Sequence, residues 1–258
     1  MISGLDRSCN STIYSLSLLL LLALPGAGFA AAILAPFEID YEVSSSGIVG
    51  IEMKRRLVQL DNGEYRFESM SHTLRPLSWF VKDRISEISR WQFHEQRLRP
   101  LHYQYIRKGG NRDKHSELEF DWQQAMVSDR QRQPVWSHAI EPQTTDELLY
   151  QLQLMMDLQA GMKSFNYIVA NDGKIRHYEY IRLGTETIDL PLGRYETVKL
   201  QRDTGKRTTT IWCAPALDYM PVRIDLKEKD GSLVRTEATR VKGLPVTIRS
   251  ETDNQVQP

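Results

Sequence analysis

The stretch that decides the fold reads FEIDYEV at residues 37–43. Apolar Phe37, Ile39, Tyr41 and Val43 alternate with three carboxylates, and the same period of two recurs at 117–122, 165–170 and 222–227. Alternation with this period places successive side chains on opposite faces of a strand. One apolar face and one charged face indicate an antiparallel sheet with one wetted side.

Turn signals separate these runs and make the strands neighbours in the sheet. Gly-containing turns with residues that tolerate positive φ occur at 61–63, 108–111, 171–173, 192–194, 204–206 and 229–231. Such turns are typical of hairpins. With roughly a dozen strands, a sheet curls, splits or closes. We therefore expect a mainly β fold, either a large curved antiparallel sheet or a partly closed barrel.

One segment breaks the alternation and predicts a single helix over residues 145–158. Thr144 and Glu147 have the spacing of a capping box, and Gly161 is placed to end the helix. A Leu and Met stripe follows one helical face, which predicts an amphipathic helix packed on the apolar face of the sheet. The stripe is either plain core, which is favoured, or a flexible wall for an apolar ligand. The candidate ligand contacts are Leu149, Leu152, Met155, Met156, Trp212 and Tyr219.

The first thirty residues are interpreted as a secretory signal peptide. An apolar run at 16–24 is broken by Pro25-Gly26 and followed by small residues, which favours cleavage after Ala30 or Ala32. A membrane anchor is the alternative, but the run has about half of the roughly 20 residues that spanning requires. After cleavage we expect no transmembrane span, a single β-rich domain over 31–243, and an extended or disordered tail over 244–258.

Charge and cysteine content exclude several classes of protein. The chain of 258 residues has 33 basic and 33 acidic side chains, which gives no global attraction to nucleic acid. Removal of the signal peptide takes Cys9 with it and leaves Cys213 as the one thiol, so no intramolecular disulfide or cysteine metal site is expected.

Motifs for catalysis, metals and cofactors are missing from the sequence. No two of the six histidines are three to five residues apart, and His94 with His102 across a hairpin is the one pairing to consider. There is no Gly-x-Ser-x-Gly elbow, and apolar neighbours make Cys213 a poor nucleophile. Asp146 and Glu147 are interpreted as residues that stabilise the helix N-terminus. We predict no catalytic residues, no metal and no cofactor.

One basic cluster stands out against the neutral total. Its basic residues, which lie near Tyr103 and Tyr105, are candidates for contact with a protein partner or a lipid headgroup. A solvated hairpin tip that guards an edge strand is the favoured interpretation, and nucleic acid is not expected. The candidate contacts are Arg97, Arg99, Arg107, Lys108 and Arg112.

Three motifs together resemble a known family. They are TDELL at 145–149, GTETIDLPLGRYETVK at 184–199 and WCAPALDYMPVRI at 212–224. The sequence resembles the exported bacterial proteins grouped as domain of unknown function 3108, although Cys213 stands where an aliphatic residue is expected. The resemblance implies a periplasmic, sheet-rich envelope protein and no established activity. A looser likeness is to periplasmic lipoprotein carriers, whose curved sheets hold acyl chains under a helical lid.

The leading functional hypothesis is a non-enzymatic periplasmic protein that binds a hydrophobic or amphipathic ligand beneath the helix. The first alternative is an assembly module of the cell envelope with a filled barrel and a protein partner. The second is an envelope hydrolase, which requires His and carboxylate side chains clustered in a pocket.

Overall fold

The computed structural model describes residues 34–75, 83–109 and 113–244, and the predicted signal peptide and nearly all of the predicted tail lie outside them. The mainly β fold is confirmed, with a long sheet, one α-helix and a short 3-10 helix at Pro215–Leu217. The strands are β1 (Phe37–Ser45), β2 (Ile48–Gln59), β3 (Tyr65–Thr73), β4 (Arg84–His94), β5 (Arg97–Lys108), β6 (Lys114–Asp121), β7 (Met126–Asp129), β8 (Trp136–Ala139), β9 (Thr144–Asp146), β10 (Phe165–Asn171), β11 (Lys174–Leu190), β12 (Gly193–Asp203), β13 (Arg207–Ala214), β14 (Met220–Glu228) and β15 (Leu233–Lys242).

Strand order follows the chain, with one junction that joins its two ends. The sheet runs from β8 back to β1, where β1 pairs with β15, and then from β15 back to β9. Neighbours pair antiparallel, except that β9 runs parallel to β10. Among the described residues no ladder joins β8 to β9, so the structure adopts the open curved sheet rather than a closed barrel.

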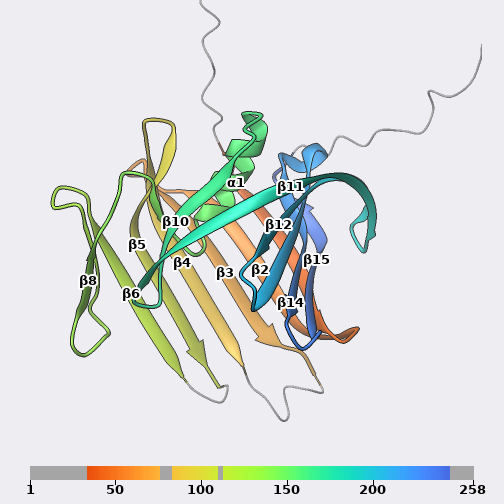
Figure 1. Cartoon of the computed structure of the whole chain (residues 1–258), viewed down its shortest axis with the longest axis horizontal. Coiled ribbons are helices and arrows are strands. Elements are labelled where there is room, and N and C mark those ends of the chain that lie inside the picture. Colours follow the sequence, from red (N-terminus) through yellow and green to blue (C-terminus); the bar gives the residue numbers. More distant parts are fainter. Residues whose placement is uncertain (1–33, 76–82, 110–112, 245–258) are drawn as a thin grey trace, which may run out of the picture. The chain divides into compact units, whose positions relative to one another are not determined.

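The sheet curves until its two halves face each other, with the helix α1 (Tyr150–Gln159) near one end (Figure 1). We call β1–β8 the first half and β9–β15 the second half. An ionic clamp holds them: Asp172, at the β10–β11 turn, pairs with Lys114 of β6 at 2.9 Å and with Arg132 at 2.5 Å. Gly173 beside the clamp has φ 63°, a backbone conformation that favours glycine, and an added Cβ would also displace the end of the Arg132 side chain.

The helix begins later than predicted, at Tyr150 rather than residue 145. Thr144 does not cap it, because its hydroxyl accepts the Glu141 N–H, and Thr144–Asp146 instead forms β9 beside β10. The capping-box prediction is therefore wrong: pairing with β10 satisfies backbone groups that a longer helix would have used internally. Gly161, with φ 69°, follows the last turn as predicted.

Helix α1 is apolar on two sides rather than along one stripe. Leu152, Met155 and Met156, together with Leu148 and Leu149 just before the helix, pack into a cluster made mostly by the first half, which we call the first core. Its other side contributes Tyr150, Leu154 and Leu158 to a cluster with β10–β13, which we call the second core. A helix between two facing sheet surfaces must bury both of its sides, and this one does. No helix among the described residues is long and apolar enough to cross a membrane.

Candidate ligand-binding cavity

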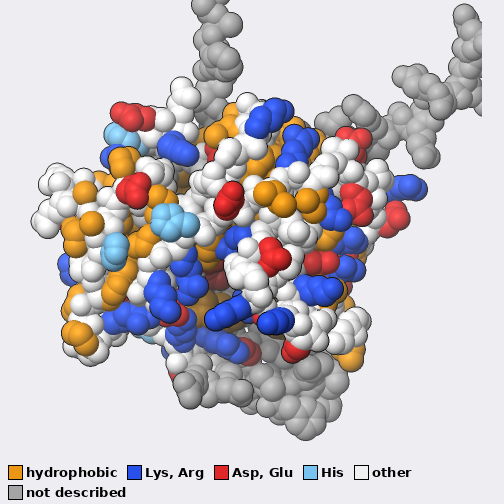
Figure 2. All heavy atoms as spheres, in the orientation of Figure 1, with side chains coloured by type: hydrophobic (Ala, Val, Ile, Leu, Met, Phe, Trp, Pro, Cys, Tyr) orange, Lys and Arg blue, Asp and Glu red, His pale blue; other side chains and the backbone are white. Residues whose placement is uncertain are grey.

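The interior is hollow beside the helix. A cavity of about 810 Å³ lies between the two halves of the sheet, and the space-filling view shows Lys and Arg side chains gathered around a hollow (Figure 2). The lining residues come from both halves and from the start of the helix. They include Met53, Arg55, Glu87, Lys114, Glu147, Tyr150, Arg176, Tyr178, Arg202, Lys206, Arg207, Ile224, Leu226 and Glu228.

Positive charge predominates in the lining, although the whole chain is neutral. Six lysines and arginines line the cavity against four carboxylates. Lys114 and Arg207 are neutralised by Asp172 and Glu228. Among the described residues, no carboxylate lies within 4 Å of the remaining four cations. These are Arg55, Arg176, Arg202 and Lys206.

Arg55 is the most unusual of these cations, because its side chain is only 9% exposed. Its Nη1 donates to the Gln151 side-chain oxygen at 2.6 Å, and its guanidinium lies 5.4 Å from the centre of the Tyr41 ring. Its Nε is buried and has no partner among the described residues. Burial of a charge without an ion pair costs several kcal/mol, and attraction to Glu87, whose pKa Arg55 lowers, offsets part of that cost.

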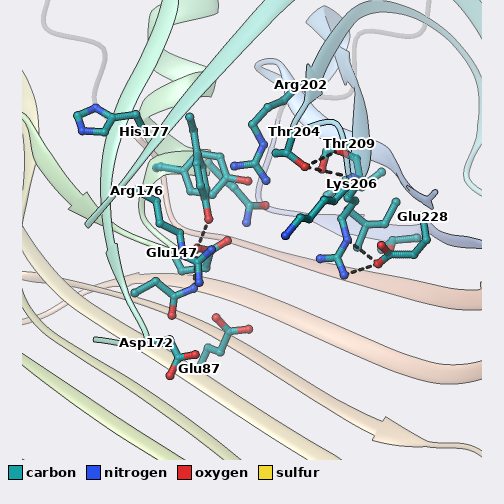
Figure 3. Close-up of a pocket in the computed structure, with 18 of the residues that line it drawn as sticks. Glu87, Glu147, Asp172, Arg176, His177, Arg202, Thr204, Lys206, Thr209 and Glu228 are labelled. Atoms are coloured by element: carbon teal, nitrogen blue, oxygen red, sulfur yellow. Dashed lines mark hydrogen bonds and ion pairs between the residues drawn. The ribbon is translucent and has the colours of Figure 1, made fainter. Parts of the chain in front are cut away.

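Arg202 repeats the arrangement on the second half of the sheet. Its guanidinium lies 3.6 Å from the centre of the Tyr178 ring, and its buried Nε likewise has no partner among the described residues. Figure 3 shows Arg202 and Lys206 directed toward the interior, with Glu87 and Glu147 bordering the same space. Guanidinium groups with free donors are suited to bidentate contacts with a carboxylate or phosphate.

Three carboxylates lie close to one another here: Glu87 and Glu147 are half-buried and line the cavity, and the fully buried Asp146 precedes Glu147 in the chain. Glu87 accepts the Tyr103 hydroxyl at 2.8 Å, and Glu147 accepts Tyr178 at 2.6 Å and Asn171 at 2.8 Å. Asp146 accepts Ser89 at 2.6 Å and the N–H groups of Leu148 and Leu149.

Burial favours the neutral form of these three acids. It raises the pKa of Asp146 to about 7 and also raises the pKa of Glu87 and of Glu147. Asp146 and Glu147 precede the helix, and Asp146 accepts the N–H groups of Leu148 and of the N-cap residue Leu149.

The predicted ligand contacts lie in the packed part of the interior. Leu149, Leu152, Met155, Met156 and Trp212 belong to the first core, and Tyr219 packs against the second. None of these six lines the cavity, whose described lining includes only Tyr150 and Gln151 from the helix. A ligand role for them stays a prediction, while their structural role in the core is plain.

The basic cluster of the sequence is spread out by the fold. Arg97 and Lys108 begin and end β5, and eleven steps of about 3.3 Å place them roughly 36 Å apart. Arg99 lies over the Trp122 ring at 4.8 Å, and Arg107 forms a two-bond pair with Asp83. Arg112 lies outside the described residues. Contact of these residues with a partner or a lipid headgroup stays a prediction.

The pairing of His94 with His102 is wrong. His94 is opposite Arg97 in the β4–β5 ladder, and His102 is opposite Arg90. A register shift between Arg90 and Trp91 separates the two histidines further along the hairpin. His102 instead faces carboxylates on its other neighbour, β6.

The cavity cations were missed although the sequence contains a signal for them. Arg55 lies on the same strand phase as Met53 and the buried Leu57. Arg202 follows buried Val198 and Leu200 on one phase, and Arg176 precedes Tyr178 and Tyr180 on another. A charged residue that occurs on the apolar phase of a strand points inward, and it marks a polar interior.

Comparisons with known proteins place the chain in a family. A β-barrel-like protein of domain of unknown function DUF1849 from Brucella abortus shares its fold, with a TM-score of 0.52, 8% identity, and coverage of 82% of this chain and 98% of that one. A candidate lipoprotein from Parabacteroides distasonis aligns at 10% identity, with a TM-score of 0.33, over 80% of this chain and 95% of that one. No curated protein matches. Residues 37–239 match the model of the family described as protein of unknown function (DUF3108), and the chain belongs to that family.

Proposed function

We propose that this is a non-enzymatic envelope protein that holds an amphipathic ligand, with its anionic group in the cavity between the two halves of the sheet. The observation that carries the proposal is the set of inward-facing cations without carboxylate partners among the described residues. Arg55 and Arg202 approach the cavity from opposite halves, and Lys206 joins them. A bound anion would supply the counter-charge that the fold leaves out.

The dimensions and the remaining lining support a small organic ligand. A volume of about 810 Å³ lies within the range of roughly 300–1,000 Å³ that is usual for small-molecule sites. Met53, Ile224 and Leu226 provide apolar wall beside the cations. A ligand with a short apolar portion and a carboxylate or phosphate matches this mixed lining better than a purely hydrophobic one.

The location belongs to the same proposal. Residues 1–30 would direct export to the periplasm and be removed after Ala30 or Ala32, and residues 31–243 would fold as a single domain. A periplasmic setting gives the cavity access to the amphipathic molecules of the envelope. The apolar helix wall first expected to contact the ligand would then be the support of the site rather than its surface.

A matched pair of fluorescent probes tests the proposal. The first is 11-(dansylamino)undecanoic acid, and the second is its methyl ester, which keeps the tail and the fluorophore but has no charge. We expect saturable binding of the acid, with an affinity at least tenfold above that of the ester, because one charge-assisted hydrogen bond contributes about 1.5–3 kcal/mol.

Variants connect the binding to the cavity. Arg202→Gln combined with Lys206→Gln should weaken binding of the acid at least about tenfold and leave the ester unchanged. Arg194→Gln is the control, because Arg194 is exposed at the β11–β12 turn. Failure of both probes to bind overturns the proposal. Equal affinity for acid and ester overturns the anionic contact alone.

A further inference from the structure

We propose a zinc site on the outer face of the sheet, built from His102 of β5 and from Glu117 and Glu119 of β6. One potential ligand atom from each of these side chains lies within 4.8 Å of the other two. The group is separate from the cavity, because none of the three residues lines it.

The spacing of the donor atoms suits a first-row metal ion. His102 Nε2 lies 3.0 Å from Glu117 Oε1 and 3.7 Å from Glu119 Oε1. Zinc bonds of about 2.0–2.2 Å to nitrogen and oxygen, arranged tetrahedrally, separate ligand atoms by roughly 3.4 Å. The two observed separations lie on either side of that value, and the two carboxylates each place an oxygen within 4.8 Å of the other, so the three side chains are close enough to share one ion.

Backbone pairing positions the three ligands in advance. Glu119 is the direct partner of His102 in the β5–β6 ladder, and Glu117 lies two residues along the same face. The Gln131 side chain donates to Glu117 Oε2 at 2.8 Å and leaves Oε1 directed at the histidine. An outer hydrogen bond of this kind orients a metal ligand.

The chemistry of the set selects the metal. One imidazole and two carboxylates match zinc, whereas calcium and magnesium prefer all-oxygen sites. His115 extends the set, since its Nε2 lies 3.9 Å from Glu117 Oε2 and it shares that face of β6. Either His115 or water would fill the fourth position. Arg90, which is opposite His102 on β4, carries a positive charge that would repel a metal ion. Its Nε pairs with Glu64 at 3.5 Å.

A second His and Glu pair on the sheet provides a matched comparison. His72 of β3 is the direct partner of Glu52 on β2, and their side chains lie 3.5 Å apart. Among the described residues no further carboxylate joins that pair to make a three-ligand group. His72 therefore tests whether any exposed His–Glu pair binds metal, or whether the second carboxylate is needed.

The experiment is a zinc titration of the purified, tag-free protein against a chromophoric chelator, with cobalt absorption as a second readout. We expect one equivalent of Zn²⁺ to bind with a Kd below about 100 µM and Co²⁺ to give the intense visible bands of low coordination. His102→Ala and Glu119→Gln should each weaken binding at least about tenfold. His72→Ala should leave it unchanged.

Circular dichroism of each variant shows whether it is folded. Glu119→Gln is an isosteric change of an exposed side chain, and it keeps the test usable if His102→Ala is unstable. A Kd above about 100 µM for the unaltered protein overturns the site. An equal loss of affinity in His72→Ala and His102→Ala also overturns it, because zinc would then bind exposed histidines without selection.

Discussion

The packed region around helix α1 and the adjoining cavity are built from strands with the same alternation, but the first is apolar and the second is charged. Around helix α1 the inward positions are apolar and closely packed, as Leu154 and Trp91 show. In the adjoining cavity the inward positions of the same sheet are Arg55, Arg202 and their charged neighbours. The comparison teaches that strand phase determines which way a residue points, while residue type determines whether that region contributes stability or a site.

The largest effect is expected in the packed part. Trp91 is fully buried in the first core, where its ring stacks on Tyr65 at a centroid distance of 4.5 Å. Trp91→Ala should lower the free energy of unfolding by about 4 kcal/mol, since it combines lost burial with a large cavity. Urea denaturation measures this. Leu183→Ala is the control, because Leu183 is 49% exposed and its truncation should change stability by less than about 0.5 kcal/mol.

The boundary between the two parts should respond to pH through Asp146. Its pKa is about 7 in the fold against 3.8 as the ordinary value, so the folded state binds the proton more tightly than the unfolded chain. Stability from this group is therefore complete below about pH 4 and is lost as pH rises to 7. From pH 5 to pH 8 the loss is about 3 kcal/mol.

Asp146→Asn isolates that contribution. An amide can still accept the Leu148 and Leu149 N–H groups and can donate to Ser89. The variant should therefore lose about 3 kcal/mol less than the unaltered protein between pH 5 and pH 8, as measured by denaturation at each pH. Equal pH slopes in the two proteins would show that Asp146 titrates normally and is not desolvated.

Removal of a charged cavity side chain should raise the free energy of unfolding, whereas truncation of a core side chain lowers it. Arg55→Met removes a buried charge that has no carboxylate partner, and we expect the free energy of unfolding to rise by about 1 kcal/mol, at the expense of ligand affinity. Arg235→Met is the comparison, because Arg235 forms a two-bond pair with Asp225. Its loss should lower stability by about 1 kcal/mol. Destabilisation by Arg55→Met of more than about 2 kcal/mol would make Arg55 a structural residue.

The smallest effect on stability and binding is expected for a surface residue outside the core and the cavity. Lys108 is exposed at the end of β5 and has no ion pair among the described residues. Lys108→Ala should change stability by less than about 0.5 kcal/mol and leave binding of the dansyl probes unchanged. A change in probe binding would connect the β5–β6 hairpin to the cavity.

Much of the fold followed from local pattern, and its failures have identifiable causes. The alternating segments became β1, β6, β10 and β14, and the Asn171-Asp172-Gly173 turn has positive φ at its last two residues. The helix start failed because Thr144–Asp146 found a partner in β10, which lies more than fifteen residues later in the chain. A capping signal reports local energies alone and cannot weigh a ladder formed with a distant strand.

The cavity could not be predicted from the sequence for a related reason. The six cavity cations come from β2, β6, β11, β12, β13 and the β12–β13 turn, and the two halves of the sheet are brought together only because β1 pairs with β15 and the sheet curves. The strand phase of Arg55 predicts that its side chain points inward. It does not predict that no carboxylate lies opposite it. Charge compensation depends on which side chains the curvature brings within a few Å of one another.

By itself the sequence determined the strands, their order in hairpins, the presence of one helix and the neutral overall charge, because these depend on residues near one another in the chain. Tertiary structure alone decided that the helix is buried on both sides, that the clamp at Asp172 joins the two halves, and that Arg55 and Arg202 face one cavity. Each of these results from long-range contacts, whose energies depend on distance in space rather than on separation along the chain.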